Sequence, residues 1–329
     1  MHPRSTIGLL ALLAALVAAS GLLVGQASLA DPVLRPTLLG LRATRAAAAF
    51  LSGAALGAAG AVVQGIFRNP LVSPSILGTT AGASLGGQAI LLAPVLFPGL
   101  GLLGGAHWDV ALPLGCLAGA GLALGVLIAF CRERSSNLVL VLTGFVLAAL
   151  FIAFGGLATS LAQDSWEVAR VITAMALGGV GGTGGRQLAM ALPLAAAALT
   201  AVWLWGPTLD VLLSGEEEAA SLGVDVHRAR RWTVAWVAML TAAAVAVGGN
   251  LGFVGLVEPH VLRPLVGAHH RRLIPASALL GGLFVVACDI LARALPTRSE
   301  LPLGVVTGLI GAPVFLALLR RAEREAAHG

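Results

Sequence analysis

Long apolar runs separated by short polar segments dominate this chain. A helix needs about 20 mostly apolar residues to cross the hydrocarbon core of a membrane. Ten runs qualify or nearly qualify: 7–26, 46–67, 75–97, 110–130, 138–161, 188–206, 232–247, 254–265, 275–295 and 301–319. The third and eighth runs are the weakest, so eight or nine spans would also fit the pattern. The pattern predicts an all-α, polytopic membrane protein with about ten transmembrane helices.

The first run has a second interpretation. It follows Arg4, and Ser28-Leu29-Ala30 resembles the small-residue cleavage site of a signal peptide. The run is long for the apolar region of a signal peptide, so we favour a retained first helix. We find no interrupting stretch long enough to fold alone, and we expect residues 1–329 to form a single transmembrane domain.

Composition supports the membrane assignment. Hydrophobic residues make up 58% of the chain, charged residues only 11%, and the mean hydropathy is +0.94. A soluble domain typically has about 25% charged residues. All 20 basic residues are arginine, and without lysine the chain cannot form a P-loop nucleotide site. If transport here needs ATP, another chain must hydrolyse it.

The net charge of +5 does not indicate nucleic acid binding, because the arginines lie in short segments between apolar runs. With ten crossings and a cytoplasmic N-terminus, twelve arginines fall in predicted inner segments and seven in outer ones, while Arg263 lies within the eighth run and is counted with neither. This bias follows the positive-inside rule. It predicts a multi-pass protein of the inner (plasma) membrane with both termini in the cytoplasm.

Two charged segments invite a functional interpretation. Residues 207–231 form the longest charged stretch between spans, and it contains an acidic helix start at Glu216-Glu217-Glu218. A solvated loop helix would explain this segment, but the segment's size and position somewhat favour a docking helix for a cytoplasmic partner.

Arg42 and Arg45 precede the second run on the predicted outer side. Interfacial snorkelling and contact with an acidic partner explain them equally well.

Catalytic and metal-binding motifs give little signal. We find no Ser/His/Asp arrangement, no H-E-x-x-H motif and no paired carboxylates, so we predict no catalytic residue and no cofactor. Glu258 and His260 alone make a poor metal site, and no metal site is predicted. Asp289 is expected to pair with Arg293, four residues later on the same helix, in a structural role. The three cysteines are interpreted as apolar fillers.

Several ordered motifs resemble a known family. They are Gly53-Ala54-Ala55-Leu56 through Gln64-Gly65, Arg68-Asn69-Pro70-Leu71 with Leu77-Gly78, Gly215-Glu216-Glu217 through Ser221-Leu222-Gly223-Val224, Gly252-Phe253-Val254-Gly255-Leu256 with Pro259-His260, and Glu300-Leu301-Pro302 through Gly311-Ala312-Pro313. The chain resembles the FecCD-type (BtuC-like) permeases of ABC importers for iron–siderophore, haem and vitamin B12. Glu258, where an apolar residue is expected, and Thr79-Thr80, where serines are more usual, depart from the family pattern.

The resemblance implies a homodimer of permeases that works with cytoplasmic ATP-binding subunits and a substrate-binding protein. It implies ATPase coupling helices at about 207–231, with Gly215, Glu216, Glu217, Ala219, Ser221, Leu222 and Gly223 in the coupling segment. It implies that Arg42, Arg45 and Arg293 dock the binding protein. It places the gate at Ser135, Ser136 and Asn137, and the pathway walls at 138–161 and 301–319.

These observations lead to one main functional hypothesis: an ABC importer permease that carries an iron chelate (siderophore or haem) or cobalamin inward. The alternative is an ATP-independent secondary transporter or channel. The scarcity of buried carboxylates for ion coupling speaks against that alternative.

Overall fold

The computed structural model describes residues 3–24, 30–97, 108–130, 137–295 and 300–328. Its helices are α1 (Pro3–Leu23), α2 (Arg35–Ile66), α3 (Thr79–Leu96), α4 (Trp108–Phe130), α5 (Asn137–Leu161), α6 (Trp166–Leu177), α7 (Gly185–Leu204), α8 (Gly206–Ser214), α9 (Glu216–Ser221), α10 (Val226–Gly248), α11 (Val257–Val266), α12 (His270–Ala294) and α13 (Leu303–His328). The chain is all-helical in these ranges, as predicted. Ser28 and Leu29 of the possible cleavage site lie outside them.

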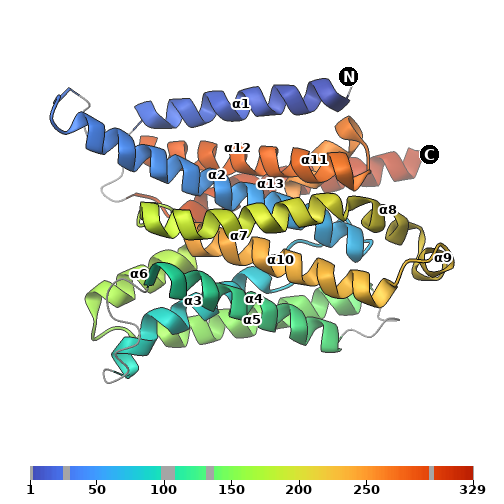
Figure 1. Ribbon diagram of the computed structural model, residues 1–329, viewed down its shortest axis with the longest axis horizontal. Helices are drawn as coiled ribbons and strands as arrows, with labels where there is room; N and C mark the ends of the chain where they lie inside the picture. Colours follow the sequence, from blue (N-terminus) through green and yellow to red (C-terminus); the bar gives the residue numbers. More distant parts are fainter. Residues whose placement is uncertain (1–2, 25–29, 98–107, 131–136, 296–299, 329) are drawn as a thin grey trace.

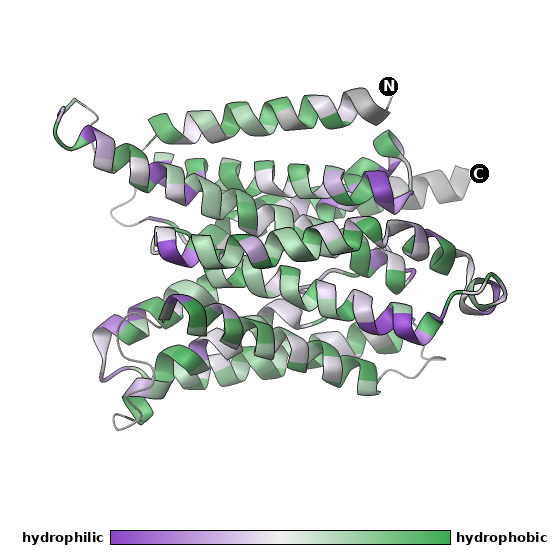
Figure 2. Ribbon diagram, viewed as in Figure 1, coloured by the Kyte–Doolittle hydropathy of each residue, from purple (hydrophilic) through white to green (hydrophobic). Residues whose placement is uncertain are grey.

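The long helices run side by side as one bundle (Figure 1). Both chain termini, α8 and α9 lie at one end of the bundle, which we call the terminal end; α6 lies at the other, which we call the far end. Hydrophilic residues gather at the two ends, and hydrophobic residues cover the length between them (Figure 2). This distribution is that of a protein embedded in a bilayer.

Within the described ranges, nine helices are long and apolar enough to cross a membrane: α1–α5, α7, α10, α12 and α13. The weak eighth run becomes α11, whose 10 residues are too few to cross alone. Between the fifth and sixth runs, the polar, glycine-rich segment 162–187 contains the short helix α6. Helix α2 begins at Arg35, so Arg42 and Arg45 lie within it rather than before it.

Glycines bring the central helices into unusually close contact. A Cβ placed on Gly53 would lie 2.1 Å from the carbonyl oxygen of Gly281, and one on Gly57 would lie 2.2 Å from that of Ser277. Helices α2 and α12 therefore touch backbone to backbone, the geometry that small residues allow in membranes. Because apolar side chains gain little by leaving lipid, this close packing is a main source of helix association.

The ends of α6 and α10 meet the start of α13. Leu303 N donates to Gly178 O, Asn250 N to Met175 O and Gly179 N to Gly248 O, each at 2.9 Å. The contacts join the ends of α6 and α10 to the start of α13. These main-chain hydrogen bonds satisfy polar groups that the helices themselves leave unpaired at their ends.

Candidate functional site

A cluster of four charged side chains, Arg45, Asp289, Arg293 and Glu300, occupies the far end. Arg45 Nη2 lies 2.9 Å from Asp289 Oδ1, and Arg45 Nη1 lies 2.8 Å from Glu300 Oε2. Arg293 Nη2 lies 2.9 Å from Asp289 Oδ2, which confirms the predicted pairing four residues apart. Sequence reasoning missed the Arg45–Glu300 pair, because these residues are 255 positions apart.

Arg42 and Arg293 also bind the end of α1. Arg42 Nη1 donates to Leu22 O at 2.9 Å and to Leu23 O at 3.2 Å, and Arg293 Nη1 donates to the carbonyl oxygens of Gly21 and Val24. The last carbonyls of a helix lack partners within it and attract cations. Both arginines are buried, with 8% and 7% of their surfaces exposed. Of the three arginines expected to dock the binding protein, Arg45 is the most accessible.

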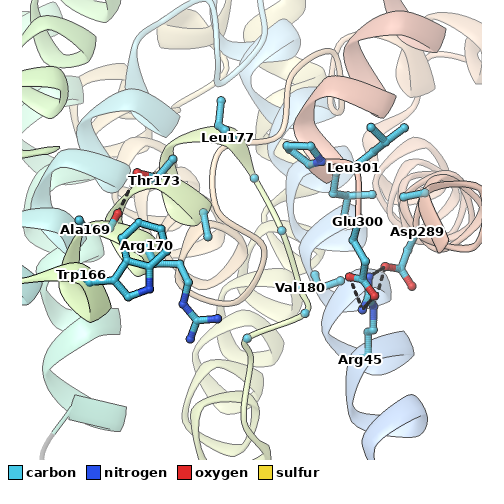
Figure 3. Close-up of a pocket in the computed structure, with 18 residues that line it drawn as sticks. Arg45, Trp166, Ala169, Arg170, Thr173, Leu177, Val180, Asp289, Glu300 and Leu301 are labelled. Atoms are coloured by element: carbon cyan, nitrogen blue, oxygen red, sulfur yellow. Dashed lines mark hydrogen bonds and ion pairs between the residues drawn. The ribbon is translucent and has the colours of Figure 1, made fainter. Parts of the chain in front are cut away.

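A cavity of about 640 Å³ opens beside the charged cluster. Arg45, Asp289 and Glu300 line one side, and Trp166 and Arg170 of α6 line the other (Figure 3). The segment from Gly178 to Gly182 passes between them. The cavity thus has an aromatic and a cationic side chain on one side, and one arginine paired with two carboxylates on the other.

A second cavity, of about 580 Å³, is almost wholly apolar. Leu138, Leu142 and Phe145 of α5 line it together with Phe253 and with Phe315 of α13. The two runs expected to form the pathway walls, 138–161 and 301–319, therefore face one cavity. Ser135 and Ser136 of the expected gate lie outside the described residues, and Asn137 is the first residue of α5, next to Leu138.

The expected coupling residues lie at the terminal end. Gly215 precedes α9, Glu216, Glu217, Ala219 and Ser221 belong to it, and Leu222 and Gly223 follow it. Ala219 is fully buried, whereas Leu222 is 66% exposed. Gly215 and Gly223 have φ values of 132° and 85°, which only glycine adopts easily. The short helix is thus held by one face and open on the other.

Helix α8 is attached to the start of α12. Asp210 Oδ1 accepts the backbone N–H of His270 at 2.9 Å and lies 2.6 Å from its ring Nδ1. Burial tends to raise the pKa of Asp210, but the hydrogen bonds from His270 outweigh it and the pKa is lowered. His270 is buried against Gly65, at the end of α2. The link therefore connects α8 to the two central helices.

Metal-binding groups do not gather in the described part of the chain, where no three His, Cys, Asp or Glu side chains could hold an ion. Glu258 is buried, and its Oε2 accepts the backbone N–H of Gly255 at 2.6 Å. The carboxylate that departs from the family pattern thus fixes the turn before α11.

Residues 5–321 match the FecCD transport family. The chain is 34% identical to the hemin transport system permease protein HmuU of Yersinia pestis, over 100% of this chain and 99% of that protein. It is 37% identical to the cobalamin import system permease protein BtuC of Halobacterium salinarum, over 82% of this chain and 70% of that protein. A solved inward-facing structure of a metal-chelate type ABC transporter superposes with a TM-score of 0.80 at 31% identity, covering 97% of this chain and 99% of that one.

These matches set aside the alternative of an ATP-independent transporter. A permease of this kind performs no catalysis and works with an ATPase and a substrate-binding protein. The chain belongs to the FecCD transport family and is the multi-pass transmembrane permease of an ABC importer.

Proposed function

We propose that two copies of this chain form a homodimer that moves an iron chelate (siderophore or haem) or cobalamin into the cytoplasm. The end-to-end match to a hemin permease carries this proposal, and relatives named for cobalamin, iron(3+)-hydroxamate and Fe(3+) dicitrate define the substrate class. The apolar faces of α5 and α13 support a pathway between the copies. Phe145 and Leu309 are 65% and 70% exposed in the isolated chain.

The terminal end is proposed to face the cytoplasm and the far end the periplasm or exterior. Both termini lie together at the terminal end (Figure 1), and the arginine bias of the sequence favours that side as inner. The protein would then lie in the inner (plasma) membrane. A single cysteine placed near either terminus, in a variant without the native cysteines, should react with an impermeant thiol reagent only after the cells are opened.

The coupling segment 215–223 is proposed to dock the ATPase, together with the rest of 207–231. Its support is the exposed Leu222 beside exposed carboxylates, on a helix anchored by buried Ala219. Leu222→Asp should weaken ATPase association at least tenfold, because a charge replaces an apolar contact. Leu34→Asp, the same change at a comparably exposed leucine of the far end, is the control. Equal association of the two variants would exclude this role.

Arg42, Arg45 and Arg293 are proposed to serve binding-protein docking at the far end. Arg45 would act by direct contact, supported by its place at the mouth of the cavity. Ser135, Ser136 and Asn137 are proposed as the inner gate, supported by the position of Leu138 in the apolar cavity.

The deciding experiment reconstitutes the permease, its ATPase and its binding protein in liposomes. Ferric hydroxamate, ferric dicitrate, haem and cobalamin are offered separately. Uptake of one chelate, dependent on both ATP and the binding protein, is expected. Uptake of none of the four with all partners present would refute the substrate class.

A further inference from the structure

All three nitrogens of the Arg45 guanidinium are already occupied within the chain. Nε donates to Asp289 Oδ1 at 2.9 Å, and Nη2 lies at the same distance from that oxygen. Nη1 donates to both oxygens of Glu300, at 3.0 and 2.8 Å. A carboxylate of a docking partner can therefore form two hydrogen bonds with the Arg45 guanidinium only by replacing one of the two internal carboxylates.

The two carboxylates are not equally replaceable. The side chain of Asp289 is 1% exposed and is shared with Arg293, so removing it from Arg45 would leave a buried charge poorly compensated. The side chain of Glu300 is 43% exposed, so water can solvate its carboxylate once it leaves. Exposed ion pairs contribute little net stability. Glu300 is thus the partner that exchanges easily.

The cluster also carries no net formal charge, since two arginines face two carboxylates. Charge attraction speeds and orients the encounter of two proteins. While Glu300 is paired with Arg45, its negative charge offsets the attraction between Arg45 and an acidic partner. Arg45 attracts the partner's carboxylate more strongly once Glu300 has moved away.

Displacement of Glu300 has a mechanical consequence. Glu300 lies three residues before α13, whose first residue, Leu303, is hydrogen-bonded to Gly178. A Cβ on Gly181 would lie 3.3 Å from Arg45 Nη1 and 3.4 Å from Glu300 Oε2, so the segment 178–182 packs directly against the ion pair. The same groups line the cavity at the far end (Figure 3).

We propose that Glu300 is an internal competitor of the binding protein: a carboxylate of the docked partner replaces it on Nη1 of Arg45, and the exchange releases the segment leading into α13. This proposal rests on the docking role of Arg45 proposed above. It adds a residue that sets docking affinity and connects docking to the wall of the pathway.

The test measures binding-protein affinity for the complete transporter in nanodiscs by surface plasmon resonance. Glu300→Gln should tighten binding by about fivefold, the equivalent of one exposed ion pair. Glu167→Gln removes the same charge from an exposed site on α6 outside the cluster, and should change affinity less than about twofold. Glu300→Asp, which keeps the charge but shortens the reach, should also tighten binding. Thermal unfolding verifies that each variant is folded.

Arg45→Gln separates the two proposals. If it weakens docking while Glu300→Gln and Glu300→Asp leave affinity unchanged or lower it, Glu300 is not a competitor and the docking role stands. If Arg45→Gln leaves docking unchanged, the docking role of Arg45 fails and the Glu300 proposal fails with it. Combined with Arg45→Gln, Glu300→Gln should lose its tightening effect; persistence of that effect would also refute the competition.

Discussion

The contact between α2 and α12 gives a sharp stability prediction. In Gly57→Ala, the new Cβ would lie 2.2 Å from the carbonyl oxygen of Ser277, whereas ordinary contacts begin near 3.4 Å. The difference, about 1.2 Å, must come from separating the helices, because a backbone oxygen cannot rotate away. Overpacking of this kind costs about 1–3 kcal/mol. Alanine recovers up to about 1 kcal/mol through its higher helix propensity.

The control is Gly121→Ala on α4, where a Cβ would meet nothing within 4 Å. It gives the same propensity gain without the clash, so the difference between the two variants isolates the packing cost. We expect Gly57→Ala to unfold several degrees below Gly121→Ala.

Thermal unfolding in detergent can be followed with a thiol-reactive fluorescent dye. Cys116 and Cys288 are 0% and 1% exposed, so both react only once the bundle opens. Cys131 is replaced by serine in every sample, which leaves these two buried thiols as the reporters. If Gly57→Ala unfolds at or above the temperature of Gly121→Ala, the backbone contact does not limit the packing of these helices and the reasoning is wrong.

Two further predictions concern the charged links. Asp289→Asn should destabilise the protein by about 3 kcal/mol in the same assay, because Arg45 and Arg293 lose their shared buried carboxylate; a loss no larger than that of Glu300→Gln would contradict this. Asp210→Asn should lower substrate uptake more than ATP hydrolysis, because the amide oxygen carries no charge and holds His270 less strongly; equal losses of both activities would argue against a coupling role. The lowered pKa of Asp210 means that its carboxylate stabilises the folded state above the usual value of 3.8 and loses this effect as pH falls below it. Unfolding temperatures of wild type and Asp210→Asn should therefore differ at pH 7 and converge at low pH, and a gap that is constant with pH would count against the link.

Local patterns in the sequence predicted local structure well. Apolar runs predicted all nine long helices of the described ranges, and the spacing of Asp289 and Arg293 predicted their ion pair. The same patterns failed where tertiary contacts decide. Helix α6 has only 12 residues, carries Glu167 and Arg170 and ends at a glycine-rich segment, so no long apolar run marks it. It is stabilised at its end by Met175 O, which accepts the N–H of Asn250.

The candidate site depends still more on distant contacts. Arg45 and Glu300 are far apart in sequence, and no periodicity links them. Arg42 depends on a distant contact too: its guanidinium binds the end of α1, and no pattern around residue 42 encodes this contact. The family motifs include Glu300, which belongs to the charged cluster. They did not reveal which carboxylate faces which arginine.

The junction of α6, α10 and α13 has an evolutionary consequence. Its three connections, Leu303 to Gly178, Asn250 to Met175 and Gly179 to Gly248, all join main chain to main chain. Main-chain bonds persist when side chains are exchanged, provided the local backbone path is kept. Neighbouring positions that line the cavities can then diversify by mutation without dismantling the scaffold. One architecture could in this way be inherited by permeases whose cargoes differ greatly in size and polarity.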